Sequence, residues 1–149
     1  MRQVVGLHAA AFIWISAAVV LPGCGAGKVG VKIEGKLTKD GAAVQLQQGE
    51  MLHLSLQSKV SSGESAIYPA KFNPADGSFV VEGPDGKGIP PGTYKVSLSV
   101  TSGATDPAGL TKMKKLAQQF KSINGKEFDV GSESKQTIAI DVAKGTITK

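Results

Sequence analysis

The sequence predicts a mainly β protein, an antiparallel β-sandwich of seven to eight strands with one short inserted α-helix near residues 107–122. Three observations support this fold class. From residue 29 onward, most segments alternate apolar and polar residues with a period of two, as half-buried strands do. Clusters of glycine, proline, aspartate and asparagine separate these segments at short intervals and indicate turns. A single segment has helical spacing instead.

The segments before residue 83 predict the first strands. Residues 29–38 place valine, isoleucine and leucine on one face and lysine, glutamate and threonine on the other. Asp40 and Gly41 tolerate the positive φ of a hairpin turn, so residues 43–46 are expected to return as a short second strand. Further strands are predicted at residues 52–57, 67–72 and 78–82.

The later segments complete the expected sheets. Residues 94–101 show the cleanest alternation in the chain, and residues 127–130 and 138–142 predict two more strands. Pro69, within the segment 67–72, cannot donate a ladder hydrogen bond. Its strand is therefore expected at an edge or at a bulge.

The period becomes helical after residue 106. Asp106 is a suitable N-cap, and Pro107 is favourable at the first helical position. Apolar residues then recur at helical spacing, and Asn124 and Gly125 end the segment. The apolar residues of this helix are Leu110, Met113, Leu116, Ala117 and Phe120.

The lysines of the predicted helix admit two interpretations. In the first, the apolar residues pack on the sandwich and the lysines form a solvated face. In the second, the lysines contact anionic lipid headgroups or another acidic envelope polymer. The residues concerned are Lys112, Lys114, Lys115 and Lys121.

Three motifs between residues 31 and 100 resemble those of a known fold family. Residues 35–44, Gly-Lys-Leu-Thr-Lys-Asp-Gly-Ala-Ala-Val, resemble the opening hairpin of carboxypeptidase-regulatory-like, transthyretin-like domains. Residues 76–79, Asp-Gly-Ser-Phe, and residues 89–96, Ile-Pro-Pro-Gly-Thr-Tyr-Lys-Val, are similar to two later motifs of that family. The resemblance implies a transthyretin-like or immunoglobulin-like sandwich over residues 29–149.

The amino-terminal segment has the composition of an export signal. Arg2 gives it a positive start, a mostly apolar run covers residues 4–21, and small residues follow. The run is also long enough for a transmembrane helix, but Pro22 and Gly23 interrupt it at once. Residues 1–23 are therefore predicted to be a signal peptide.

The residues that follow the apolar run resemble a lipobox, the processing site of bacterial lipoproteins. They are Leu21, Pro22, Gly23 and Cys24. The resemblance implies that the Cys24 thiol receives a diacylglycerol and that a peptidase cuts before it. Residues 24–28 would then be a tether, and the protein would be exported and membrane-anchored in the cell envelope, with the leaflet left open. The alternative is an incidental thiol at the end of an uncleaved anchor.

Composition argues against several functional classes. The net charge of +5 is mild, and Arg2 is the only arginine. A nucleic-acid-binding protein normally uses arginine and stacking aromatics, so nucleic acid is not an expected partner. Outside the signal the only histidine is His53, which alternation places on an exposed face. It has no second histidine or cysteine beside it for zinc. No cofactor, metal or catalytic motif is predicted.

The function that these observations favour is a non-catalytic, lipid-anchored envelope protein that acts as a structural or interaction module. The alternative is a carbohydrate- or small-ligand-binding module that uses loops such as residues 84–92. Sugar-binding surfaces usually need exposed aromatics, and the only tryptophan, Trp14, lies in the predicted signal. An enzyme is disfavoured because the motifs above are missing.

Overall fold

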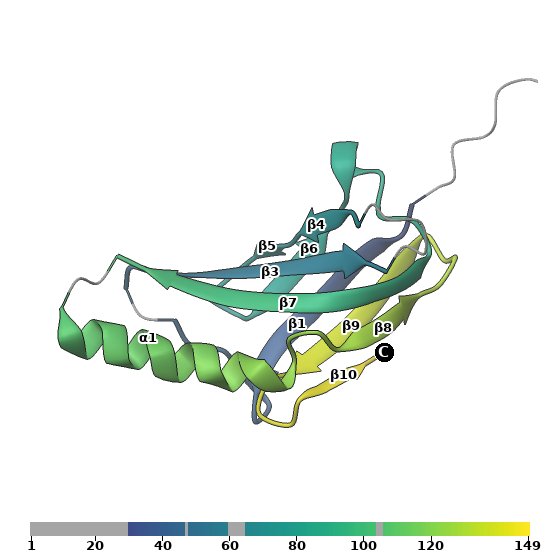
Figure 1. Ribbon diagram of the computed structural model, residues 1–149. Helices are drawn as coiled ribbons and strands as arrows, with labels where there is room; N and C mark the ends of the chain where they lie inside the picture. Colours follow the sequence, from purple (N-terminus) through teal and green to yellow (C-terminus); the bar gives the residue numbers. More distant parts are fainter. Residues whose placement is uncertain (1–29, 47, 60–64, 104–105) are drawn as a thin grey trace, which may run out of the picture.

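The structure, a computed structural model, describes residues 30–46, 48–59, 65–103 and 106–149. These residues form two β-sheets and one α-helix, α1 (Pro107–Gln119) (Figure 1). The six-stranded sheet contains β1 (Lys32–Lys39), β2 (Ala42–Ala43), β5 (Lys71–Phe72), β6 (Ser78–Val81), β9 (Lys135–Asp141) and β10 (Thr146–Thr148). The four-stranded sheet contains β3 (Glu50–Ser58), β4 (Ile67–Pro69), β7 (Gly92–Ser102) and β8 (Glu127–Val130). The mainly β, sandwich-like prediction is confirmed at this level.

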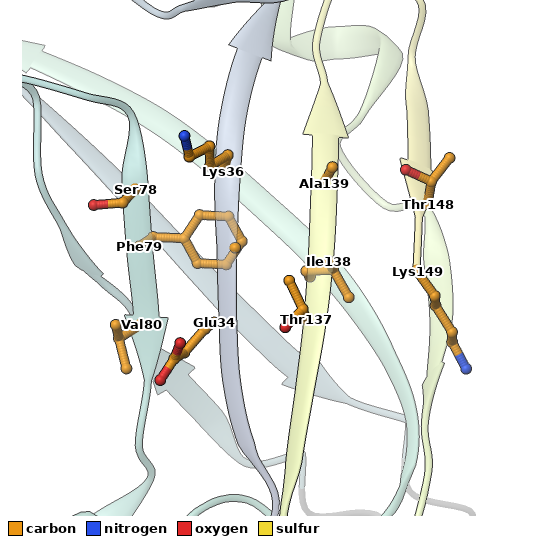
Figure 2. Close-up of a pocket in the computed structure, with 11 residues that line it drawn as sticks. Glu34, Lys36, Ser78, Phe79, Val80, Thr137, Ile138, Ala139, Thr148 and Lys149 are labelled. Carbon is orange, nitrogen blue, oxygen red and sulfur yellow. The ribbon is translucent and has the colours of Figure 1, made fainter.

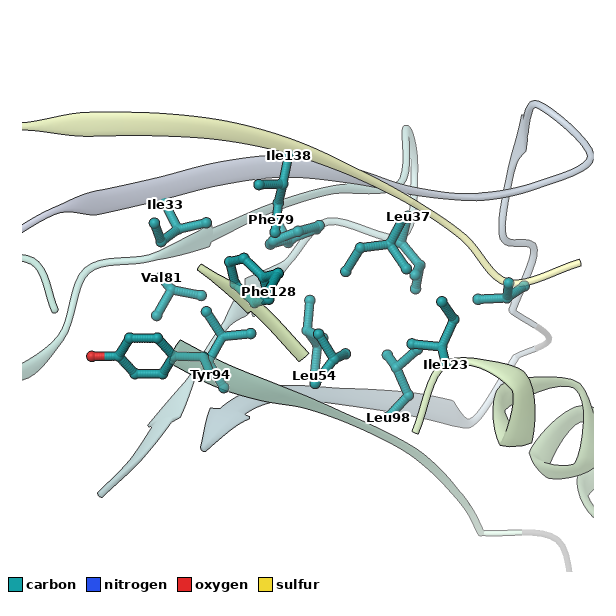
Figure 3. Packing of buried hydrophobic residues seen from close by; sticks show 14 of the residues in the cluster. Ile33, Leu37, Leu54, Phe79, Val81, Tyr94, Leu98, Ile123, Phe128 and Ile138 are labelled. Carbon is teal, nitrogen blue, oxygen red and sulfur yellow. The ribbon is translucent and has the colours of Figure 1, made fainter. Parts of the chain in front are cut away.

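The two sheets share one hydrophobic core. Because side chains alternate across a strand, the apolar residues of each segment lie on its inner face. Ile33 and Leu37 of β1 are buried, whereas Lys36 and Lys39 between and beside them are exposed. Figure 3 shows side chains from the two sheets meeting in this core: Ile33, Leu37, Phe79, Val81 and Ile138 from one, and Leu54, Tyr94, Leu98 and Phe128 from the other.

One strand pair contradicts the expectation of an antiparallel sandwich. β1 and β9 are parallel, with Lys32 opposite Lys135 and Thr38 opposite Asp141. The chain between them passes through the four-stranded sheet, so β9 does not return from a hairpin. A parallel pair requires such a long connection. The other strand pairs of the described residues are antiparallel.

The segment 67–72, expected as one strand, divides between the two sheets. β4 pairs with β3, and its Pro69 lies on an edge strand as predicted. β5 pairs with β6 in the other sheet. Ala70 connects them and donates its backbone N–H to the Leu54 oxygen at 2.8 Å. This division and the unpredicted β10 give ten strands among the described residues instead of seven to eight.

Gly35 makes room for an aromatic ring in the core. It is opposite Phe79 on β6 and Ile138 on β9. A Cβ at Gly35 would lie 2.5 Å from the Phe79 ring and 2.4 Å from the Ile138 carbonyl oxygen. Glycine is therefore required here because the ring occupies the space of its missing side chain.

Helix α1 is inserted between β7 and β8, as predicted, and a 3₁₀ turn, η2 (Phe120–Ser122), extends it. Asp106 Oδ1 accepts a hydrogen bond from the Gly109 N–H at 2.9 Å and caps the first turn. Only the carboxyl-terminal end enters the core: Phe120 is fully buried and Leu116 packs against the core, but Leu110 is 40% exposed. The expectation that all the apolar helix residues pack on the sandwich is therefore confirmed only for this end.

Candidate functional site

The predicted lipidation site lies outside the described residues. This holds for the signal peptide 1–23, for Leu21, Pro22, Gly23 and Cys24, and for the tether 24–28. The described chain begins at Gly30. Next to it, Val31 and Ile89 exchange backbone hydrogen bonds of 2.7 and 2.9 Å. The amino terminus of the two-sheet domain is therefore held at the end where β1 and β7 begin.

Helix α1 lies at the other end of the domain (Figure 1). Its first residue follows the last residues of β7, which run away from the Val31–Ile89 pair. Its carboxyl-terminal half shares a shallow groove with Lys39, the last residue of β1, through Leu116 and Gln119. β1 has eight residues, which span about 26 Å at ~3.3 Å each. The helix and the start of β1 are thus separated by the length of the sheet.

The helix lysines remain without salt bridges in the part of the chain that the structure describes. Lys112, Lys114, Lys115 and Lys121 are all exposed, and none forms an ion pair with a described residue. The sequence from Pro107 to Lys126 contains no aspartate or glutamate. The positive charge of this segment is therefore not neutralised within it.

Four of the six lysines in the strands, in contrast, form ion pairs. Glu82 binds Lys71 at 2.6 Å and Lys32 at 3.1 Å, and Glu34 binds Lys135 at 2.7 Å. The hydrogen bond from Lys135 lowers the pKa of Glu34, and hydrogen bonds from Lys71 and Lys32 lower the pKa of Glu82. These carboxylates stay ionised over a wider pH range and compensate part of the positive charge of the six-stranded sheet. The lysines with ion pairs are Lys32, Lys59, Lys71, Lys95, Lys135 and Lys144.

A groove of about 580 Å³ crosses the outer face of the six-stranded sheet (Figure 2). Small side chains on neighbouring strands form its floor, among them Ala139 and Thr137 of β9 and Ser78 of β6. Lys36 and Lys149 stand at its rim without an ion pair to a described residue. No local pattern in the sequence indicates this groove, because its strands are distant in sequence and β9 joins them in parallel.

Other residues considered in the sequence lie apart from this groove. His53 is exposed on β3, as predicted, and its Nε2 is 3.0 Å from Thr101 Oγ1. The loop 84–92 contains a 3₁₀ turn, η1 (Pro84–Gly86), which borders a second groove of about 470 Å³ beside β4. Among the described residues, no group of three histidine, cysteine, aspartate or glutamate side chains could hold a metal ion. None of the helices described is long and apolar enough to cross a bilayer.

Comparisons with protein-family models, with curated proteins and with solved structures find no match to this chain.

Proposed function

We propose that this chain is an exported, lipid-anchored protein of the bacterial cell envelope that acts as a non-catalytic structural or interaction module. The observation that carries the proposal is the sequence Leu21-Pro22-Gly23-Cys24, directly after a positive residue and a long apolar run. Two or three acyl chains on one residue hold a protein firmly to a bilayer, whereas a single chain does not.

The position of the core supports this division of the chain. Every buried hydrophobic residue that the structure describes lies between Val31 and Val142. The described hydrophobic core therefore consists of residues that follow the segment assigned to export. Cleavage before Cys24 would leave the two sheets and their connections intact.

A transthyretin-like or immunoglobulin-like identity for the domain belongs to the same proposal. Its support is local. Asp40 and Gly41 have φ of 53° and 83° in the turn between β1 and β2. The buried Tyr94 donates its hydroxyl hydrogen to the Pro90 oxygen at 2.6 Å, four residues upstream. A tyrosine that hydrogen-bonds back in this way is typical of immunoglobulin-like sandwiches.

Intact-mass analysis of the native chain from its own membranes tests the anchor. We expect a chain that begins at Cys24 and carries a diacylglycerol, with or without an acylated amino group. The variant Cys24→Ala is expected to stay unlipidated and uncleaved, so its intact mass should include residues 1–23 and lack a diacylglycerol. Ser16→Ala, also in the signal, is the matched control and is expected to be processed normally. A native chain that begins at Met1 with an unmodified thiol would refute the proposal.

A ligand-binding module is the second candidate, and the groove on the six-stranded sheet is the observation that favours it. Its rim presents the hydroxyl of Thr148 and two lysines, Lys36 and Lys149, to solvent. Thermal-shift screening against mono- and oligosaccharides is the test. A ligand that stabilises the parent protein but not Lys36→Glu would establish this function. If the screen finds no such ligand, the ligand-binding candidate is rejected and the interaction module remains the proposed function.

A further inference from the structure

We propose that helix α1, which lies on the side of the domain opposite its lipid anchor, is a docking surface for an acidic polysaccharide. The direction in which the helix faces is set by the lipid anchor, so this part of the inference rests on the proposed function. The contact itself depends only on the described residues. It is carried by the unpaired charge, the distribution of that charge around the helix, and the position of the helix.

The unpaired charge gives the complementarity. Four helix lysines have no ion pair with any described residue. Of the other described lysines six have ion pairs, and the five without one lie on β1, in loops or at the last residue: Lys36, Lys39, Lys87, Lys126 and Lys149. α1 and η2 therefore form the part of the described surface with the largest run of lysines that lack an ion pair. Such a surface attracts a polyanion over the range of the Debye length.

The distribution of the lysines favours a flexible chain over a flat surface. Successive residues of a helix are rotated by about 100°. Lys114 and Lys121 therefore lie on one side of α1 and η2, Lys112 on nearly the opposite side, and Lys115 between them on the outer face. A planar bilayer can contact only one side of a helix, whereas a flexible polymer can bend around the helix and contact several sides.

The position of the helix also disfavours the anchoring membrane as its partner. The residues from Cys24 to Val29 number six and can reach at most about 20 Å. They would join the domain at Val31, and the sheet separates this end from α1. The anchor thus holds the Val31 end close to the bilayer and leaves the helix directed into the space beyond.

The residue types distinguish a polysaccharide from other polyanions. α1 and η2 contain no arginine, and their one aromatic residue, Phe120, is fully buried, so bases have neither a bidentate donor nor a stacking surface. Protein interfaces are depleted of lysine and have an apolar centre, whereas the one large exposed apolar side chain of α1 is Leu110. A lysine ammonium is a compact charge without directional demands, which suits carboxylates spaced along a sugar chain.

The experiment measures binding of the full chain, held in neutral detergent, to polygalacturonate by isothermal titration calorimetry. The test variant is Lys112→Gln/Lys114→Gln/Lys115→Gln. The matched control, Lys71→Gln/Lys95→Gln/Lys135→Gln, removes the same charge from the sheets. We expect the test variant to bind about tenfold more weakly, because three ionic contacts are lost, and the control to change by less than about twofold. Binding should also weaken as salt is raised.

Three results would overturn the proposal: equal losses in the two variants, undetectable binding by the parent protein, or tighter lysine-dependent binding to anionic phosphatidylglycerol vesicles than to the polysaccharide. Circular dichroism verifies that each variant is folded. Cys24→Ala separates this proposal from the anchor. It is expected to bind polygalacturonate as the parent does, so a failure of lipidation and a failure of docking give different results.

Discussion

The side-chain amide of Asn124 forms two hydrogen bonds with the backbone of Leu98. Its Oδ1 accepts from the Leu98 N–H at 2.6 Å, and its Nδ2 donates to the Leu98 oxygen at 2.9 Å. β8 pairs with β7 only as far as Lys95, and the backbone around Gly125 pairs with Val96. The Asn124 amide therefore continues the ladder by one further pair. It attaches the end of α1 and η2 to the four-stranded sheet.

Replacement of Asn124 by alanine is expected to lower the free energy of unfolding by about 1–3 kcal/mol, because Leu98 loses partners for both backbone groups. Urea denaturation measures the change. Gln118→Ala is the control, since Gln118 is exposed on α1. Equal stability of the two variants would show that water replaces the amide without cost.

A methyl group at Gly35 is expected to destabilise the domain by about 1–3 kcal/mol or more, as overpacking of a core does. The added Cβ would meet the Phe79 ring and a backbone oxygen of β9. Gly103→Ala is the matched control, because a Cβ there has nothing within 4 Å. Thermal unfolding of both variants measures the difference. A Gly35→Ala protein as stable as its control would mean that Phe79 can move aside.

Tyr94 should make stability fall at alkaline pH. Burial raises the pKa of Tyr94 from 10.0 to about 12. A group with a raised folded-state pKa contributes its full stability below the unfolded-state pKa and loses it as pH rises. The contribution of Tyr94 should therefore be complete below about pH 10 and decline toward pH 12.

Tyr94→Phe isolates this effect from other alkaline titrations. At neutral pH the variant should be about 1–2 kcal/mol less stable, because the Pro90 carbonyl loses its hydroxyl partner. Urea titrations between pH 8 and pH 12 should show the two proteins converging, because this range runs from below the unfolded-state pKa of 10.0 to the folded-state pKa of about 12. A constant difference across the series would mean that Tyr94 ionises as readily in the folded protein as in the unfolded one.

Glu82 should make stability fall at acidic pH, whereas Tyr94 makes it fall at alkaline pH. Hydrogen bonds from Lys71 and Lys32 lower its pKa below 4.5. Its contribution to stability is therefore present above the unfolded-state pKa and is lost as pH falls through the folded-state value. The stability difference between the parent and Glu82→Gln should be largest at neutral pH and should close in acid. Parallel denaturant titrations measure the difference, and Glu133→Gln, which removes a carboxylate at an exposed position, is the charge-matched control.

Local patterns in the sequence predicted those features that depend on neighbouring residues. Alternation identified the buried faces of β1, β3, β7 and β9, because successive side chains of any strand point to opposite sides. Asp106 and Pro107 predicted the start of α1, and Asp40 with Gly41 predicted a tight turn. These features follow from backbone geometry and short-range hydrogen bonds, which the residues concerned carry themselves.

Contacts between distant segments could not be predicted in this way. Nothing in residues 67–72 shows that the chain changes sheets at Ala70, because β4 and β5 have the same alternation. The Asn124–Leu98 pair and the packing of Phe79 over Gly35 join elements that are 26 and 44 positions apart in the chain. Sequence spacing alone assigned Leu110 to the core, but the helix extends past the sheet there and leaves it exposed.

The amino-acid sequence by itself determined the buried faces, the turn after β1 and the helix, because each depends on residues a few positions apart. The lipobox stays a prediction. Only the tertiary structure decided that β9 lies parallel to β1, that a groove crosses the outer sheet, and that the basic helix and the start of the domain occupy opposite ends. The physical reason is that burial of apolar surface is non-directional. It specifies which side chains go inside and does not specify which strands become neighbours.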